Sequence, residues 1–294
     1  MIRTRLLIGT VLALMAAALV YLDGFLAPWY PLVGGTVLAV LWRAAYELRQ
    51  LLEPGHRPPY LVLALGLTVC WAANWWPLLA ASWFPDSRFF TTSVWTAVLF
   101  AYCSTFLVAF LWEIACYPHA GAALPRLAAT TLILTYLGLL SSCFLQLRLL
   151  PPLGEESAAL AWMVAAIAVP KANDIAAYFT GTYLGRTPMA PHLSPRKTWE
   201  GAAGGLAGGV LAAFLMVHWQ PSLFPAGLVE AALFGLLVGG AGMLGDLAES
   251  LWKRECHAKD AAALLPGFGG LLDVIDSLLF AAPVVYVWSQ IRLR

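Results

Sequence analysis

Residues 227–251 read GLVEAALFGLLVGGAGMLGDLAESL, an almost uninterrupted apolar stretch that carries Asp246 and Glu249 near its end. A helix rises about 1.5 Å per residue, so a stretch of this length can cross the hydrocarbon core of a bilayer. The next such stretch, residues 269–291, carries Asp273 and Asp276. Because an ionised carboxylate at the centre of a bilayer costs about 2.5–3.5 kcal/mol, these four side chains must face protein, water or a cation. The two stretches therefore predict membrane helices with an acidic site among them.

The composition of the whole chain also indicates a membrane protein. Apolar residues make up 61% and charged residues 11% of the sequence, with a mean hydropathy of +0.77, which is outside the range of soluble proteins. The 17 basic and 16 acidic residues give a formal net charge of +1, so no overall field would recruit nucleic acid. The five cysteines are scattered and lack the spacing of a zinc site or a disulfide framework, so we expect them to be small core residues.

Apolar stretches of membrane-spanning length recur along the chain. They lie near residues 6–22, 28–48, 60–82, 91–114, 124–147, 158–182, 201–219, 227–251 and 269–291. The sequence therefore predicts an all-α, polytopic integral membrane protein with about nine transmembrane helices, the sixth of them broken at Pro170. We expect residues 1–150 to be mainly structural, with Glu47 and Glu113 reaching headgroup water at helix ends. Residues 151–294 are expected to form the catalytic region, with two polar loops.

The distribution of basic residues predicts the orientation, because Lys and Arg are retained on the cytoplasmic side. If the N-terminus is cytoplasmic, twelve basic residues lie in cytoplasmic segments, four lie on the opposite side and Lys171 lies within a span. The basic pair Arg3 and Arg5 precedes an apolar run that is long for a signal peptide, so a retained first span is expected. The expected location is the cytoplasmic membrane of a bacterium, with the N-terminus and both polar loops on the cytoplasmic side.

The spacing of the acidic residues predicts that their side chains converge. Asp273 and Asp276 are three residues apart and share one helix face, and Glu249, Ser250 and Lys253 follow Asp246 at offsets of three, four and seven. Carboxylates without clustered His or thiolate ligands suit Mg²⁺. Two alternatives share this acidic pattern: buried ion pairs that only connect helices, and the ion or proton pathway of a transporter.

Two polar segments could present cations and backbone N–H groups to phosphate. One contains Lys253, Arg254, Lys259 and Asp260, followed by the turn Pro266-Gly267-Phe268-Gly269-Gly270. The other contains Gly181, Gly185 and Arg186 and then SPRKTWEG at residues 194–201. In this second segment Ser194 or Thr198 can cap a helix, Pro195 suits a first helical turn, and the basic pair can hold an anionic group. Upstream, Asp174 and Tyr178 lie one helical turn apart.

These residues resemble the signature of the phosphatidate cytidylyltransferases, also called CDP-diacylglycerol synthases. The matching positions are Ser250, Lys253, Arg254, Lys259, Asp260, Pro266, Gly267, Gly269, Gly270, Asp273 and Asp276, preceded by Gly245, Asp246, Leu247 and Glu249. The stretch from Asp174 to Gly201, with its Ser-Pro-x-Lys-Thr-x-Glu-Gly string, is similar to the second conserved block of that family. The resemblance covers roughly the last 120 residues. It departs from the family pattern at Phe268, where His is usual, and at Val274, where Arg is usual.

The resemblance implies transfer of CMP from CTP to phosphatidate with Mg²⁺ as cofactor. It implies Asp246, Asp273 and Asp276 as metal ligands, and these three with Lys259 and Asp260 as catalytic residues. The expected substrate-binding residues are Asp174, Tyr178, Ser194, Lys197, Thr198, Glu200, Ser250, Lys253, Arg254, Gly269 and Gly270. The expected partners are CTP, phosphatidate or a related lipid phosphate, and membrane lipids; the oligomeric state stays open, with a homodimer as one option.

Two competing functions remain at this stage. The departures at Phe268 and Val274 leave open a related enzyme that activates a different lipid phosphate with CTP. A transporter would show an internal repeat with broken spans in corresponding positions, whereas the polar features of this chain gather in one half.

Overall fold

The computed structural model describes residues 2–83, 93–117, 120–149, 156–258 and 270–292. The chain divides into two compact units, one comprising Met1–Leu145 with a segment that ends at Leu272, and the other Gln146–Lys259 with Asp273–Arg294. Among the predicted site residues, Lys259, Asp260 and Gly269 lie outside the described residues, as does Phe268.

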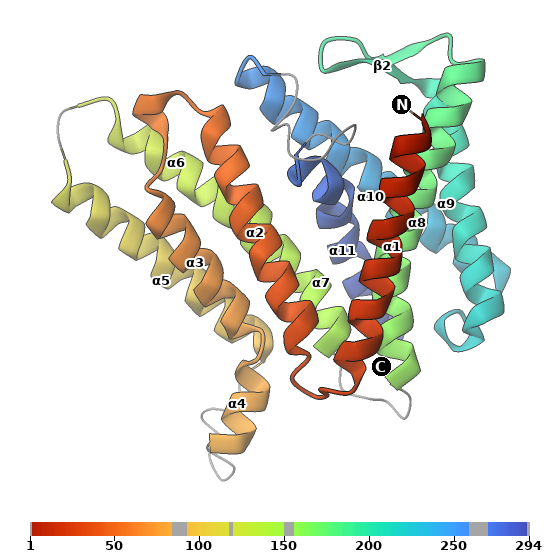
Figure 1. The fold of residues 1–294 in the computed structure, drawn as a ribbon, viewed down its shortest axis with the longest axis horizontal. Coiled ribbons are helices and arrows are strands. Elements are labelled where there is room, and N and C mark those ends of the chain that lie inside the picture. The colour runs from red at the N-terminus through yellow and green to blue at the C-terminus, as the bar shows by residue number, and fades with distance from the viewer. Residues whose placement is uncertain (1, 84–92, 118–119, 150–155, 259–269, 293–294) are drawn as a thin grey trace. The chain divides into compact units, whose positions relative to one another are not determined.

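The first unit is built from helices (Figure 1). In chain order these are α1 (Ile2–Gly24), α2 (Pro31–Leu51), the short η1 (Pro54–His56), α3 (Tyr60–Ala73), α4 (Trp76–Trp83), α5 (Val94–Ala115), α6 (Ala123–Ile133), the π-helical η2 (Leu134–Leu139) and the start of α7 (Leu140–Leu149). The helices α3 and α4 are bent by 60° at the break between them. Close packing of α3 against α5 depends on Gly66, where a Cβ atom would overlap the Thr105 side chain.

Two carboxylates of the first unit, Glu47 and Glu113, are buried and do not reach headgroup water, contrary to the expectation from the sequence. Glu47 is only 1% exposed and accepts hydrogen bonds from the backbone N–H groups of Leu271 and Leu272. Glu113 is 5% exposed and forms a bidentate ion pair with Arg126, with N–O distances of 2.6 to 3.1 Å. Both carboxylates are buried because the protein itself supplies the donors that water would otherwise supply.

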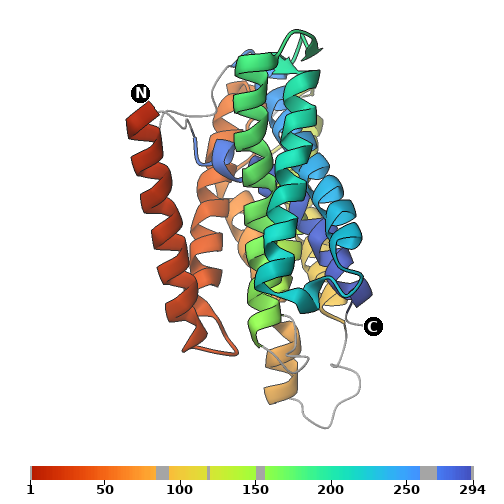
Figure 2. The ribbon, with the colours of Figure 1, turned by 90° about the vertical axis from the view of Figure 1, so that its right-hand side faces the viewer.

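The second unit consists of long helices and one β-hairpin (Figures 1 and 2). Its elements are the end of α7, then α8 (Glu156–Leu184), β1 (Pro188–Ala190), β2 (Ser194–Thr198), α9 (Trp199–Trp219), the short η3 (Pro221–Leu223), α10 (Leu228–Glu255) and α11 (Leu272–Arg292) from Asp273 onward. The helices α8 and α9 lie side by side, and α10 packs against both (Figure 2).

Two local predictions in this unit are wrong. Pro170 does not break a helix, since α8 runs through it without interruption. Membrane helices tolerate proline because neighbouring groups and local adjustments satisfy the freed backbone carbonyl. Gly242 of α10 packs directly against the ring, since a Cβ atom there would lie 2.9 Å from Pro170 Cβ. Pro195 does not open a helix either, because it lies in β2, which pairs with β1 in an antiparallel hairpin.

Small residues allow α8, α9 and α10 to approach one another closely. A Cβ atom on Gly204 of α9 would overlap Thr180 of α8, and a Cβ atom on Gly235 of α10 would lie 2.7 Å from Cα of Val210 in α9. Helix pairs in membranes associate through such close backbone contacts, because lipid supplies no hydrophobic driving force. These contacts set the spacing of the helices that carry the polar residues described below.

The all-α polytopic class is confirmed, with the hairpin as an addition. Within the described part of the chain, six helical segments are long and apolar enough to cross a membrane: Val94–Ala115, Ala123–Leu149, Ala158–Leu184, Trp199–Trp219, Leu228–Glu255 and Leu272–Arg292. The bent pair of α3 and α4 would make a seventh. The predicted number of about nine spans is not confirmed. The first two predicted spans do coincide with helices, α1 and α2.

Candidate active site

Three carboxylates of the second unit converge between α10 and α11. Asp246 and Glu249 lie one turn apart on α10, Asp276 lies on α11, and one oxygen atom of each lies within 4.8 Å of the others. The helices approach closely at this point because Gly245 has no side chain; a Cβ atom there would overlap the Asp276 carbonyl oxygen. Glu249 and Asp276 are 2% and 5% exposed and thus shielded from water, whereas the Asp246 side chain is 38% exposed.

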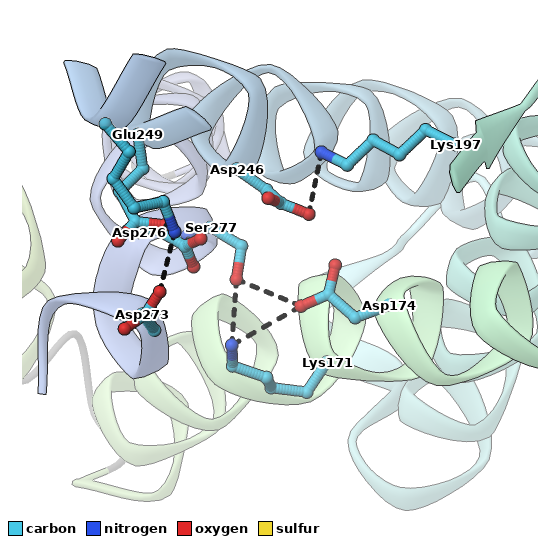
Figure 3. A network of polar contacts seen from close by, with 9 residues as sticks. Lys171, Asp174, Lys197, Asp246, Glu249, Asp273, Asp276 and Ser277 are labelled. Atoms are coloured by element: carbon cyan, nitrogen blue, oxygen red, sulfur yellow. Dashed lines mark hydrogen bonds and ion pairs between the residues drawn. The ribbon is translucent and has the colours of Figure 1, made fainter. Parts of the chain in front are cut away.

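Two lysine side chains form ion pairs with carboxylates of this cluster (Figure 3). Lys197 Nζ of β2 lies 2.8 Å from an oxygen of Asp246. Lys253 Nζ lies 2.8 Å from Glu249 and 2.7 Å from Asp273, which places Asp273 in an ion pair beside the cluster. Of the three predicted metal ligands, Asp246 and Asp276 lie together in the acidic cluster, which also contains Glu249. The third, Asp273, forms an ion pair with Lys253 instead.

A second polar group lies between α8 and α11 (Figure 3). Lys171 Nζ donates to Ser277 Oγ at 2.9 Å and to Asp174 Oδ2 at 3.3 Å. Ser277 Oγ donates to the same Asp174 oxygen at 3.1 Å, and the Ser277 backbone N–H donates to the Asp276 carboxylate. Asp174 is thereby linked through Ser277 to the acidic cluster.

The cluster has the chemistry of a divalent-cation site. Its ligands are hard carboxylate oxygens, which suit Mg²⁺, Ca²⁺ or Mn²⁺ better than soft metals. Glu249 Oε1 is buried and has no hydrogen-bond partner among the described residues. A buried carboxylate oxygen without a donor is costly, so a cation at this position would supply the missing interaction.

A cavity of about 590 Å³ opens beside the cluster. Helices α8, α9 and α10 and the hairpin all contribute to its wall. The predicted residues in this wall are Asp174, Tyr178, Lys197, Thr198 and Asp246, and Arg196 lies among them. Residues of the polar segment that ends in SPRKTWEG thus line one cavity with Asp246, which belongs to both the cavity and the acidic cluster.

Other predicted substrate-binding residues make contacts that hold the local structure. Thr198 Oγ1 caps α9 by accepting from the Gly201 backbone N–H at 3.1 Å. Glu200 accepts from the backbone N–H groups of Arg186 and Thr187, and Arg254 Nε donates to the Leu193 carbonyl at 3.0 Å. These contacts fix both ends of the hairpin. Ser194 forms the last described pair of the hairpin, Ser250 is buried on α10, and Gly270 lies just before α11.

Three residues in this region have no role predicted from the sequence. Lys171 was notable only as a charge within an apolar stretch, and that was the signal that could have identified it. Ser277 had no signal beyond its position next to Asp276. Glu249 was recognised as an intramembrane carboxylate but not as a ligand, because spacing along a helix does not show how that helix is rotated against its neighbour.

Comparisons with known proteins agree on one family. The profile that describes the cytidylyltransferase family matches residues 3–292. The chain is 43% identical over 142 residues to a phosphatidate cytidylyltransferase of Brucella suis, covering 47% of this chain and 50% of that one. It is 38% identical over 157 residues to one of Bacillus subtilis, covering 53% and 55%. It is also 43% identical over 124 residues to the uncharacterized protein YnbB of Escherichia coli, covering 42% and 41%. The matches thus span about half the length of these relatives.

Proposed function

Since the chain belongs to the cytidylyltransferase family, we propose that it transfers CMP from CTP to phosphatidate, giving CDP-diacylglycerol and pyrophosphate. The printed names of the Brucella suis and Bacillus subtilis relatives support this substrate pair. The observation that carries the proposal is the double position of Asp246, which lies in the acidic cluster and in the wall of a cavity that also contains Arg196 and Lys197. A polyphosphate in that cavity would meet cations and reach a metal-binding carboxylate at the same time.

Asp246, Glu249 and Asp276 are proposed to hold Mg²⁺, with Asp273 acting through water. When bound, Mg²⁺ supplies charge neutralisation and orientation of the phosphate groups. Lys197 and Lys253 hold Asp246 and Glu249 in place before substrate arrives, since each carboxylate oxygen that they bind is already aligned.

The reaction needs little proton transfer from the protein. A phosphate monoester has a second pKa of about 6, so most of the lipid phosphate is a dianion near neutral pH. One of its oxygens attacks the α-phosphorus of CTP, a new P–O bond forms, and the bond from that phosphorus to the bridging oxygen of the β-phosphate breaks. Pyrophosphate takes the electron pair of the broken bond. Lys197 and Arg196 neutralise the phosphate chain and hold it in line, which is the main requirement for this type of transfer.

The cavity also offers an aromatic surface. Tyr178 lines the cavity and is 57% exposed, and its hydroxyl group is a polar end on an otherwise apolar ring. A nucleoside at this position would have a ring to stack on. With Lys197 and Arg196 on the hairpin, the wall therefore combines a surface for a base with cations for the phosphates.

The direct test is to incubate the detergent-purified protein with CTP labelled in the α-phosphate, Mg²⁺ and phosphatidate, and to identify the labelled lipid. We expect labelled CDP-diacylglycerol and one equivalent of unlabelled pyrophosphate. An Asp246→Asn variant of equal thermal stability serves as the control for contaminating activity. No labelled lipid with any lipid phosphate would refute the proposal.

A related activity is kept as the second candidate. Val274, in the first turn of α11, lies next to Asp273 and replaces the Arg that the family pattern usually has there. Because this chain lacks the Arg at that position, one positive charge is missing beside the acidic side chains. This difference favours a preference for a lipid phosphate other than phosphatidate. Label appearing with another lipid phosphate, and not with phosphatidate, would identify this alternative; the family membership gives the transporter alternative no support.

A further inference from the structure

Lys171 is a charged side chain in the middle of a membrane-spanning helix, and the proposed transfer gives it no role. It lies on α8, within the span Ala158–Leu184, and its side chain is 33% exposed. A lysine within an apolar membrane-spanning segment needs a partner, and charges in such segments are usually functional. Two of the three N–H bonds of its ammonium group are directed at Ser277 and Asp174.

These two contacts connect Lys171 with the proposed metal site. Asp174 lines the cavity, and Ser277 follows Asp276 directly in α11. The ammonium group also lies within electrostatic range of the Asp276 carboxylate. Lys171 therefore acts on the site through Asp174 and Ser277, whereas Lys197 pairs with Asp246 (Figure 3).

The ammonium group of Lys171 changes the net charge of this network of acidic and basic side chains. Within the described part of the chain, the network contains five carboxylates and three ammonium groups: Asp174, Asp246, Glu249, Asp273 and Asp276 with Lys171, Lys197 and Lys253. When a metal is bound its carboxylate ligands are deprotonated, and five negative and three positive charges then leave a net charge of −2, which is the charge that one divalent cation neutralises. Without Lys171 the balance would be −3, which attracts cations more strongly and repels a polyphosphate.

We propose that Lys171 is a positioning residue that sets the charge balance of the metal site. Its ammonium group neutralises Asp174 and orients Ser277, so that the network matches one divalent cation and still admits an anionic nucleotide. This inference rests on the proposed function for the identity of the nucleotide, but its effect on the metal alone can be measured separately.

The test uses the full chain, purified in detergent, with variants that change the charge and variants that keep it. Lys171→Met removes the ammonium group, and Lys171→Arg keeps the charge as the matched control. Asp174→Asn changes the charge in the opposite direction, and the double variant Lys171→Met/Asp174→Asn restores the balance of −2. Mg²⁺ binding is measured by calorimetry without nucleotide, and the KM for CTP is measured with saturating Mg²⁺.

Lys171→Met is expected to bind Mg²⁺ about three- to tenfold more tightly, because one unit charge acts through a partly solvated medium. Asp174→Asn is expected to bind it more weakly by a similar factor, while Lys171→Arg and the double variant stay near wild type. The KM for CTP should rise severalfold in Lys171→Met and stay near wild type in Lys171→Arg. A lysine that only connects two helices would lower the thermal midpoint and move neither quantity in this direction.

Two results would overturn the inference. One is a folded Lys171→Met protein with unchanged or weaker Mg²⁺ affinity; if that variant does not fold, unchanged affinity in Asp174→Asn has the same meaning. The other is a wild-type protein that binds no Mg²⁺ without nucleotide. A wild-type protein that binds Mg²⁺ with the expected shifts but transfers no CMP would refute the proposed function and leave the charge balance supported.

Discussion

Asp273 and Asp276 lie one helical turn apart on α11 but meet different partners. Asp276 shares the acidic cluster with Asp246 and Glu249, whereas Asp273 is held by Lys253, which also binds Glu249. Lys253 is only 12% exposed, so its two carboxylates keep a buried ammonium group neutralised. Asp276 is therefore a proposed metal ligand, whereas Asp273 is a proposed neighbour of the metal.

Conversion of Asp276 to Asn should lower Mg²⁺ affinity and turnover together by more than about tenfold, since even outer-shell changes at metal sites cost 10- to 100-fold. The shape is kept, so the thermal midpoint should change little. Asp273→Asn is the matched comparison. Lys253 keeps its ion pair with Glu249 in this variant, and the metal loses no direct ligand. The Mg²⁺ affinity of Asp273→Asn should therefore fall less than that of Asp276→Asn. Calorimetry and a melting curve on the same samples check both. Equal losses of affinity would make Asp273 a direct ligand, and full activity in both variants would eliminate the metal site.

At the scale of elements, the β1–β2 hairpin depends on contacts at its ends. Arg254 of α10 donates to the Leu193 carbonyl in the hairpin turn and to the Ala258 carbonyl. The guanidinium group of Arg254 thus binds backbone carbonyls of the hairpin turn and of the end of α10. Lys197, which lies on the hairpin itself, lines the cavity. Arg254 and Lys197 should therefore affect nucleotide use by different routes.

Arg254→Ala should raise the KM for CTP by up to about tenfold, because a hydrogen bond from a charged group contributes about 1.5 kcal/mol at the low end of its range. It should also increase amide hydrogen exchange across residues 188–198, since the hairpin loses its contact with α10. Lys197→Ala should raise the same KM while the exchange stays as in wild type. Unchanged KM in both variants, at normal expression, would show that the hairpin takes no part in nucleotide binding.

The packing of α9 against α10 offers a second prediction at this scale. Gly235→Ala places a Cβ atom 2.7 Å from Cα of Val210, so the helices must separate, at a cost of about 1–3 kcal/mol. Gly240→Ala is the matched control on the same helix, because its nearest neighbour would be 4.0 Å away. Thermal unfolding in one detergent should show a lower midpoint for Gly235→Ala only. A midpoint equal to that of Gly240→Ala would mean that this helix contact is not tight in solution.

For the whole molecule, the orientation in the membrane is still a prediction. Twelve basic residues against four favour a cytoplasmic N-terminus and hairpin. The test is His192→Cys, in the exposed hairpin turn, and Thr4→Cys, each on a functional background without accessible native cysteines. An impermeant maleimide added to intact cells should label neither, and should label both after permeabilisation. Labelling of intact cells would reverse the orientation.

The helices of this molecule could largely be predicted from sequence, because runs of apolar residues in lipid have few alternatives to a helix. The hairpin could not, since its strands of three and five residues show no alternation and contain prolines. The continuity of α8 was also hidden, because proline usually ends a helix in water but is tolerated within a membrane helix. In the candidate site, spacing placed the acidic residues on shared faces. Which of them meet depends on helix rotation, and that follows from contacts such as Gly245 with Asp276.

The lengths of α8 and α10 have a consequence for how a lipid would reach the site. Asp174 lies eighteen residues after the first residue of α8, and Asp246 eighteen residues after the first residue of α10. At 1.5 Å per residue both lie about 27 Å along their helices, near the far edge of a hydrocarbon core about 30 Å thick. Each helix then continues for two to three more turns, to Leu184 and Glu255. The carboxylates would thus stand at the depth of lipid headgroups, so a phospholipid could present its phosphate while its acyl chains stay among their neighbours, and only the water-soluble reactant would have to travel.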